Sequence, residues 1–213
     1  MSYTLYGHPR SGSCIVELAL AEIGAPYETH DIDLRANQQR DAEYAQRNPH
    51  RKLPTLVTPG GETLTESVAI LLTLDQRHPD AKLLPPKSSP AYAQSLRWLM
   101  FVATEIYPVV EINDYPERFA PQTMKDAGED MGPVRETARQ IWRRRWLIVE
   151  AHISGDPYLL NSGFCLSDLY IAIVSRWAQQ DEWRPAHIPK VERLTSAVAA
   201  RPACSPVWRR HFS

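Results

Sequence analysis

The first 24 residues contain two successive patterns of apolar side chains. Residues 3–6 alternate in the manner of a half-buried β-strand and are rich in β-forming types. Cys14, Leu18 and Ala21 then recur at the spacing of one helix face, and Gly24 is a usual residue at a helix end. The chain therefore begins with a predicted strand followed by a helix.

The pattern of residues 27–78 adds three strands and one or two helices. Residues 27–34 predict a second strand, and the polar residues 35–47 predict a second helix or an irregular turn. Two short strands flank the Pro-Gly-Gly-Glu turn at 59–62, as in a hairpin. A helix with apolar residues almost all round begins at Glu66. Residues 1–78 therefore predict an α/β domain of the order βαβαββα.

A different pattern follows a proline-rich segment. Residues 79–90 contain four prolines in twelve residues, which excludes a helix or a central strand and predicts a linker. Residues 91–213 contain only helical periodicity and predict an all-helical domain. Pro108 should end or kink its first helix, and residues 116–133, rich in Pro and Gly, separate that helix from the next. The apolar positions that mark the helices are Leu96, Leu99, Met100, Ala103 and Tyr107; Trp142, Trp146, Val149 and Ile153; Leu166, Tyr170, Ile173, Val174 and Trp177; and Val191, Leu194 and Val198.

Charge and hydropathy exclude several function classes. The 24 Lys and Arg residues balance 25 Asp and Glu residues, so no basic surface for nucleic acid is indicated. No apolar run approaches the ~18 residues of a membrane span, and residues 1–10 lack the pattern of a signal peptide. We therefore expect a cytoplasmic protein with neither a nucleic-acid nor a membrane partner.

The potential metal ligands are dispersed. Cys14, Cys165 and Cys204 are far apart, and the 7 histidines form no pair at metal-ligand spacing. We expect neither a disulfide framework nor a bound metal. The run Arg143-Arg144-Arg145 is most simply a solvated face, although one of these charges could attract an anionic ligand.

Four segments together resemble the soluble glutathione transferase superfamily. They are SGSC (11–14), NPHRKLPTLV (48–57), LTESVAILLTL (64–74) and FCLSDLYIAI (164–173), and their order matches that family along nearly the whole chain. The resemblance is to a bacterial member of the theta-like or zeta-like serine type. It implies a thioredoxin-like N-terminal domain that binds glutathione and an all-helical C-terminal domain that binds the acceptor substrate. One departure is Cys165, where the family usually has Ser or Thr before the helix that contains Asp168.

The resemblance changes the interpretation of Pro54. Only about 5–6% of X-Pro bonds in folded proteins are cis, so Leu53-Pro54 taken alone predicts a trans bond. The family implies a cis bond, which would turn the Leu53 backbone outward to pair with glutathione as an added strand does. Lys52 is a candidate for the glycyl carboxylate, although a solvated lysine is equally consistent with the sequence.

Glu66 and Ser67 stand where a helix begins. One interpretation is helix capping, since acidic and hydroxyl side chains are favoured there. The resemblance implies a second role, in which Ser67 receives the γ-glutamyl carboxylate and Glu66 pairs with the ligand ammonium. Both roles are compatible.

Three small groups at the start of the first helix are candidates for stabilising the glutathione thiolate. Ser11 occupies the register of the activating serine in the theta-like and zeta-like classes, and is the preferred candidate. Ser13 is the second candidate. Cys14 is the third, as a redox thiol, but it lies inside the predicted helix and is expected to face the core. Tyr6 lies within the first strand and is expected to pack rather than to activate the thiol.

The helical domain supplies the candidate acceptor pocket. The resemblance places it along the helix that begins at Ala91, and the candidate lining residues are Trp98, Phe101, Val102, Tyr107 and Tyr115. Aromatic residues at helical spacing are also typical of a core.

The predicted function is glutathione S-transferase activity on small hydrophobic electrophiles, with glutathione as co-substrate and a homodimeric assembly. Two alternatives remain open at the level of sequence. One is glutathione-dependent reduction of disulfides or hydroperoxides on the same fold, and the other is a non-catalytic binding module. The sequence does not identify the acceptor.

Overall fold

The computed structural model describes residues 2–178 and 180–212, which divide into two compact units. Unit 1 is built from the residues up to Lys87 together with those from Ala197 onward, and unit 2 is built from Ser88–Ser196. Unit 1 contains a mixed sheet and unit 2 is helical, as the hydrophobic pattern predicts.

Four strands in the order β2-β1-β3-β4 form the sheet of unit 1. β1 (Tyr3–Gly7) runs parallel to β2 (Tyr27–Asp31) and antiparallel to β3 (Thr55–Val57), which forms a hairpin with β4 (Thr63–Thr65). The predicted hairpin is confirmed, and β2 ends at Asp31 rather than at residue 34. The parallel β1–β2 pair requires the crossover through α1 (Ser13–Ile23).

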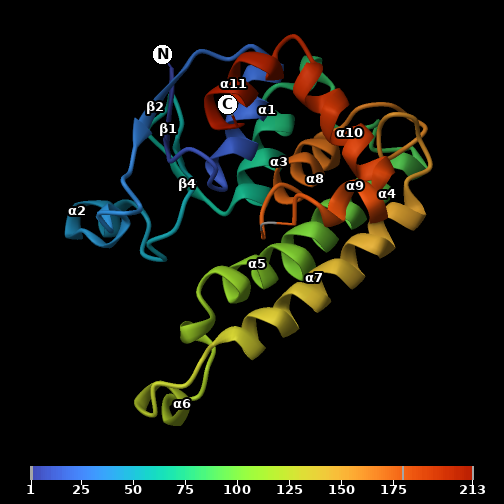
Figure 1. The fold of residues 1–213 in the computed structure, drawn as a ribbon. Helices are drawn as coiled ribbons and strands as arrows, with labels where there is room; N and C mark the ends of the chain where they lie inside the picture. Colours follow the sequence, from blue (N-terminus) through green and yellow to red (C-terminus); the bar gives the residue numbers. More distant parts are fainter. Residues whose placement is uncertain (1, 179, 213) are drawn as a thin grey trace. The chain divides into compact units, whose positions relative to one another are not determined.

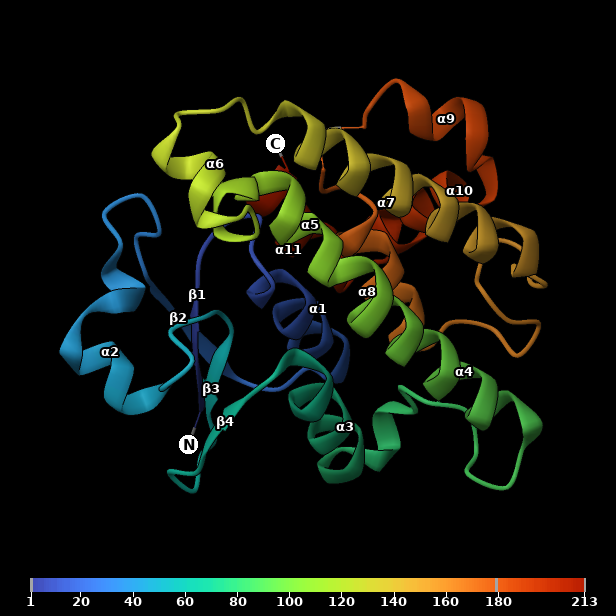
Figure 2. The ribbon, with the colours of Figure 1, turned by 90° about the horizontal axis from the view of Figure 1, so that it is seen from below.

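Helices cover both faces of this sheet. α1 and α3 (Ser67–Arg77) pack together on one face, while α2 (Ala42–Arg47) lies beside the other (Figures 1 and 2). Residues 35–47 form a 3₁₀ turn (Gln38–Arg40) followed by α2, which fits the prediction of a helix or irregular turn. Gly24 ends α1 with φ of 66°, a conformation that glycine adopts without a steric penalty.

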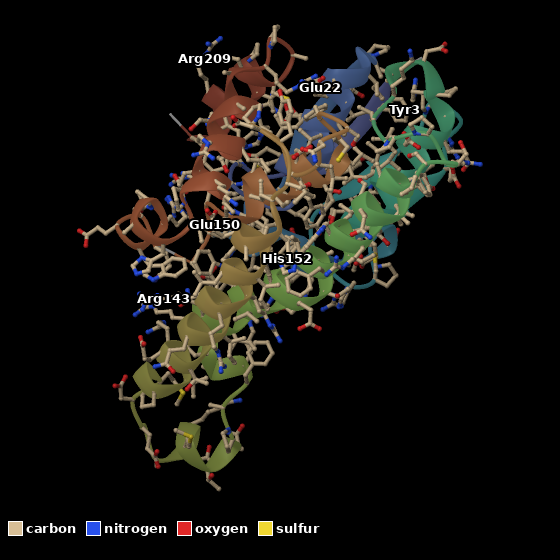
Figure 3. All side chains as sticks on the ribbon, turned by 90° about the vertical axis from the view of Figure 1, so that its right-hand side faces the viewer. Tyr3, Glu22, Arg143, Glu150, His152 and Arg209 are labelled. Atoms are coloured by element: carbon tan, nitrogen blue, oxygen red, sulfur yellow. The ribbon has the colours of Figure 1, made fainter. Side chains whose placement is uncertain are left out.

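The C-terminal helix α11 (Cys204–Phe212) belongs to unit 1. This differs from the expected division, which assigned residues 91–213 to one helical domain. α11 packs against α1 (Figure 1). Glu22 of α1, labelled in Figure 3, accepts two hydrogen bonds of 2.7 Å from the Arg201 guanidinium and one of 3.1 Å from the Cys204 thiol. The chain therefore returns to its first domain after the helical unit.

Unit 2 is organised around one buried helix. Every residue of α8 (Leu166–Val174) is buried, as expected for a helix that is apolar all round. Asp168 accepts hydrogen bonds from the backbone N–H groups of Cys165 and Leu159, so its carboxylate caps the start of α8. The other helices that contribute to unit 2 are α4 (Pro90–Phe101), α5 (Tyr107–Asp114), α6 (Gln122–Asp126), α7 (Gly132–His152), α9 (Trp183–His187) and α10 (Pro189–Ala200).

Pro108 interrupts the first long helix of unit 2, as predicted. A π-helical segment (Val102–Ile106) separates α4 from α5, because proline cannot donate the next helical hydrogen bond. Glu150 of α7, labelled in Figure 3, accepts from the backbone N–H groups of Lys190 and Val191 at the start of α10. Among residues 2–178 and 180–212, no helix combines the length and apolar sequence needed to cross a bilayer.

Candidate active site

A tight turn connects β1 to α1. The Ser11 N–H donates to the His8 carbonyl at 3.1 Å, which closes a four-residue turn with Pro9 in its second position. Arg10 in the third position has φ of 64°. Proline followed by a residue with positive φ is typical of a type II turn, where glycine is the usual third residue. We call residues 8–13 the serine turn.

Ser13 is the buried member of the serine turn. Its side chain is almost inaccessible, and its Oγ accepts the His8 N–H at 3.1 Å and lies 2.8 Å from the Oγ of Ser11. Gly7 makes this approach possible, because a Cβ atom at that position would lie 2.3 Å from the Ser13 Oγ. Ser13 therefore supports the turn and contacts Ser11 directly.

Ser11 is half-buried and is the more accessible hydroxyl. Its Oγ accepts the Ser13 N–H at 3.3 Å and lies within hydrogen-bond distance of the Ser13 hydroxyl. A hydroxyl donates one proton and accepts through two lone pairs. When Ser13 donates to Ser11, the proton of Ser11 is available for a ligand. The competing acceptor for the Ser13 proton is the His8 carbonyl, which is farther away at 3.3 Å.

Cys14 lies inside α1 and faces the protein interior, as expected. Its side chain is fully buried, and burial raises the pKa of its thiol to about 12. A thiolate is the reactive form of cysteine, so this side chain is poorly suited to act as a nucleophile or redox thiol at neutral pH.

The Leu53-Pro54 peptide bond is cis, as the family resemblance implied. The carbonyl of Lys52 accepts hydrogen bonds from the Tyr44 hydroxyl at 2.8 Å and from the Asn48 amide at 2.7 Å. Within the described residues, no hydrogen bond involves the backbone N–H or carbonyl of Leu53. These two backbone groups therefore lie unpaired at the start of β3.

The start of α3 has an unusual backbone conformation. Glu66 adopts φ of 62° and ψ of 108°, which side chains other than glycine rarely adopt. Its exposed carboxylate lies 3.7 Å from the Nδ1 atom of His50. Ser67 is the first residue of α3 and is buried. Strained backbone of this kind is concentrated at binding sites, where the surrounding structure holds it in place.

Strand register brings these motifs to one end of the sheet. Near the end of β1, Tyr6 pairs with Thr55 at the start of β3, and Thr55 pairs with Thr65 at the end of β4. The serine turn follows β1, Pro54 immediately precedes Thr55, and Ser67 comes two residues after Thr65. Three motifs separated along the sequence therefore meet at the same end of the sheet.

Comparison with known proteins agrees with this arrangement. Residues 1–76 match the family model described as the N-terminal domain of glutathione S-transferase. The GST-like protein YncG of Escherichia coli is 27% identical over 97% of both chains, and the glutathione S-transferase GstA of Escherichia coli is 25% identical over 93% of both. The crystal structure of a glutathione transferase homologue from Sulfitobacter superposes with a TM-score of 0.88 at 25% identity, covering 100% of this chain and 99% of that one. The chain belongs to the soluble glutathione transferase superfamily.

In this member of the superfamily, Tyr6 packs against other side chains, as expected. Its ring lies 4.9 Å from that of His30 and 6.2 Å from that of Tyr44, with the Arg47 guanidinium 5.1 Å away. The tyrosine at the end of β1 is therefore part of an aromatic cluster in unit 1.

The predicted acceptor-pocket residues differ in burial. Trp98 and Val102 are buried, and the Trp98 ring contacts Phe101 at 5.5 Å and His152 at 5.4 Å. Phe101 and Tyr107 are half-buried, while Tyr115 is 44% exposed. Trp98 and Val102 are therefore core residues. The accessible aromatic surface among the predicted pocket residues belongs to Phe101, Tyr107 and Tyr115.

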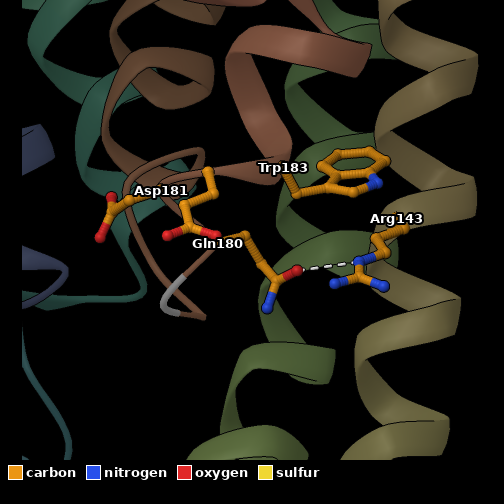
Figure 4. Close-up of a pocket in the computed structure, with 5 residues that line it drawn as sticks. Arg143, Gln180, Asp181 and Trp183 are labelled. Atoms are coloured by element: carbon orange, nitrogen blue, oxygen red, sulfur yellow. Dashed lines mark hydrogen bonds between the residues drawn. The ribbon is translucent and has the colours of Figure 1, made fainter.

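Unit 2 also contains a polar cavity of about 490 Å³, lined by Arg143, Gln180, Asp181, Glu182 and Trp183 (Figure 4). The Nε atom of Arg143 donates to Gln180 at 2.8 Å, and its guanidinium lies 5.6 Å from the centre of the Trp183 ring. The side chain of Arg143 thus makes specific contacts, beyond the solvated face that its sequence neighbours suggested. Both of these partners belong to the same unit, and they orient the guanidinium at the cavity wall.

A buried charged cluster behind the serine turn was not anticipated from the sequence. Glu17 of α1 is fully buried, and it contacts His211 and Arg210 of α11 and the Tyr27 hydroxyl. The one signal in the sequence was a glutamate, Glu17, on an apolar helix face. This signal did not indicate which residues would pair with the carboxylate. In the described part of the chain, no group of three His, Cys, Asp or Glu side chains has the arrangement of a metal site.

Proposed function

We propose that this protein conjugates glutathione to small hydrophobic electrophiles, with Ser11 as the residue that stabilises the glutathione thiolate. The observation that supports this proposal is the accessible Ser11 hydroxyl, which lies within hydrogen-bond distance of the Ser13 hydroxyl. It stands at the end of the sheet where Pro54 and Ser67 also lie. The homologue from Sulfitobacter was crystallised with bound glutathione, which supports the same ligand for this chain.

A serine at this position can supply the required stabilisation. A thiol with a pKa of about 8.5 is only ~3% ionised at pH 7, and lowering its pKa by two units requires about 2.7 kcal/mol. A hydrogen bond to a charged group contributes about 1.5–3 kcal/mol, and a helix N-terminus adds about 0.3–1 kcal/mol. Ser11 and the start of α1 together meet this requirement without a cationic side chain.

The other groups at this end of the sheet match the backbone and the charged termini of glutathione. The unpaired N–H and carbonyl of Leu53 suit an extended peptide that adds beside β3. Ser67 at the N-terminus of α3 suits the γ-glutamyl carboxylate, and the exposed Glu66 carboxylate suits its ammonium group. Lys52 is exposed and directly precedes Leu53 in the sequence, so its charge suits the glycyl carboxylate of glutathione.

The reaction follows from the thiolate. The thiol proton passes to water, the sulfur forms a bond to an electrophilic carbon, and the leaving group departs with the electron pair of the broken bond. Ser11 stabilises the charge on sulfur, and binding both reactants supplies proximity. Phe101, Tyr107 and Tyr115 provide apolar surface of the kind that binds a small hydrophobic acceptor.

The serine favours a theta-like or zeta-like mechanism, and the burial of Cys14 argues against a cysteine-based reductase. We also propose a cytoplasmic homodimer. The exposed apolar side chains of Met100, Leu147 and Ile148 are consistent with an interface on the helical unit.

The test compares wild type with Ser11→Ala in the conjugation of glutathione to a chlorinated nitroaromatic. We expect kcat/KM to fall about 10- to 100-fold, because a hydrogen bond to charged sulfur is worth ~1.5–3 kcal/mol. The Kd for glutathione should change little, since the Leu53 and Ser67 contacts remain. An undiminished rate in Ser11→Ala removes this serine from the mechanism. Absence of glutathione binding by wild type would instead favour a non-catalytic module.

A further inference from the structure

Glu17 is a carboxylate held entirely inside unit 1. Only 1% of its surface is exposed, and it lies one helical turn after Ser13 on α1. One oxygen accepts the Tyr27 hydroxyl at 3.0 Å and pairs with the Arg210 guanidinium. The other oxygen lies 2.8 Å from the Nε2 atom of His211. A buried carboxylate requires such partners, because removing it from water is costly.

The hydrogen bonds of His211 define its protonation state. Its Nδ1 atom accepts the backbone N–H of Arg10 at 3.3 Å, so Nδ1 carries no proton. The proton of the neutral ring is therefore on Nε2, which donates to Glu17. Burial and the Arg210 charge lower the pKa of His211 to about 4, in agreement with a neutral ring at pH 7.

Arg10 is the residue of the serine turn that most needs external support. It occupies the third position of the turn with φ of 64°, where an arginine is less favourable than glycine. The hydrogen bond that closes the turn is made by the Ser11 N–H, and the Arg10 N–H donates to His211 outside the turn. α11 supports Arg10 twice, through His211 and through Phe212, whose ring centre lies 5.8 Å from the guanidinium carbon.

We propose that His211 is a positioning residue for Ser11: it holds the Arg10 amide and thereby keeps the serine turn in the geometry that donates to the glutathione sulfur. The proposal rests on the function proposed above. The bond from Nε2 to Glu17 stabilises the packing of α11 against α1, whereas the bond from the Arg10 amide to Nδ1 is the one that acts on Ser11. α11 thus contributes to thiol activation without touching the substrate.

Two conservative substitutions separate the two hydrogen bonds of His211. In His211→Asn, the amide oxygen replaces Nδ1 and still accepts the Arg10 N–H, whereas the donor to Glu17 is lost. In His211→Gln, the amide nitrogen replaces Nε2 and still donates to Glu17, whereas the acceptor for Arg10 is lost. The full-length variants are compared by the pKa of bound glutathione, measured from the ultraviolet absorbance of the thiolate, and by kcat, KM and Tm.

We expect His211→Gln to raise the pKa of bound glutathione by about one unit, which corresponds to about tenfold less thiolate below that pKa. kcat at neutral pH should fall by a similar factor while the KM for glutathione changes less. His211→Asn should keep the wild-type thiol pKa even though its Tm is lower. Should His211→Gln not fold, the folded Asn variant remains decisive, because a raised thiol pKa there contradicts the proposal.

Glu22→Gln is the matched control, since it weakens the contacts of α1 with Arg201, which precedes α11, and with Cys204 of α11, without touching the serine turn. It should lower Tm and leave the thiol pKa unchanged. Equal thiol pKa values in wild type and His211→Gln would overturn the proposal, as would an equal rise in Glu22→Gln. If wild type binds glutathione without lowering its pKa, the proposed function itself fails, and the role of His211 fails with it.

Discussion

The serine turn depends on a contact between two residues that are not adjacent in sequence. Ser13 is able to support Ser11 because Gly7 leaves space beside the Ser13 side chain. The sequence ranks Ser11 first, Ser13 second and Cys14 third as candidates, and it predicts that Cys14 faces the core, but it gives Ser13 no supporting role. Burial separates them: Ser11 remains accessible, Ser13 supports the turn, and Cys14 faces the core.

Gly7→Ala tests this contact. The added Cβ would lie 2.3 Å from the Ser13 Oγ and 2.5 Å from its Cβ, so the turn must shift. We expect a loss of about 1–3 kcal/mol from overpacking, or about 2–4 °C in Tm per kcal/mol. Transferase activity should fall by more than the loss of folded protein explains, because Ser13, the partner of Ser11, is displaced.

Gly60→Ala is the control for this substitution. Gly60 lies in the hairpin turn, and the nearest atom to an added Cβ is 3.9 Å away. Its stability should stay within about 0.5 kcal/mol of wild type. Equal Tm and activity for the Gly7 and Gly60 variants would show that the space beside Ser13 is unimportant.

At the scale of elements, the hydrophobic pattern did not predict α11, nor did it predict the five-residue helices α6 and α9. The buried residues of α11, Cys204, Val207 and His211, recur at helical spacing, but the segment is short and also contains Pro206 and three basic residues. Isolated helices of this length are marginal in water. α11 therefore depends on packing against α1, where Glu17 contacts Arg210 and His211 and Glu22 accepts from the Cys204 thiol.

This packing should make stability depend on pH. The pKa of His211 is lowered from 6.5 to about 4, so the unfolded chain takes up a proton between these values that the folded protein does not. The contribution of His211 to the free energy of unfolding is complete above pH 6.5. It is lost as pH falls toward 4, by up to about 1.4 kcal/mol per pH unit. The charged and titratable groups that act on it are Glu17, Arg210 and His8.

The measurement is the urea midpoint at several pH values in wild type and in His211→Asn. The variant lacks the imidazole, so its curve should fall less steeply between pH 6.5 and 4 than that of wild type. Parallel curves would mean that His211 titrates alike in the folded and unfolded states.

At the scale of the whole molecule, unit 1 is built from both ends of the chain. Its second segment begins at Ala197, far from the family-model match at residues 1–76. The sequence-based boundaries at 78 and 90 separate the sheet from the helices, but the final segment joins the sheet domain. A fragment that ends at the linker therefore lacks part of the packing around α1.

A chain that ends after Ala203 tests this dependence. Removing α11 exposes Glu17 and removes its His211 and Arg210 partners, and breaking a buried ion pair costs about 3–5 kcal/mol. We expect a strong fall in Tm and reaction of Cys14 with thiol reagents. Arg209→Ala, on the exposed side of α11 (Figure 3), is the control and should leave both properties near wild type. An unchanged Tm after truncation would contradict the assignment of α11 to unit 1.

Local sequence was sufficient to establish the order βαβαββα, the linker, the helical unit and the motifs that contain Ser11, Pro54 and Ser67. These features depend on side-chain periodicity and on turn residues, which act over a few neighbouring positions. Folding in three dimensions was needed to settle which hydroxyl stays accessible and how strand register gathers the motifs at one end of the sheet. It also brought His211 to Glu17 across 194 residues of sequence. Such contacts require complementary partners from distant segments, and local pattern contains no information about which segments will meet.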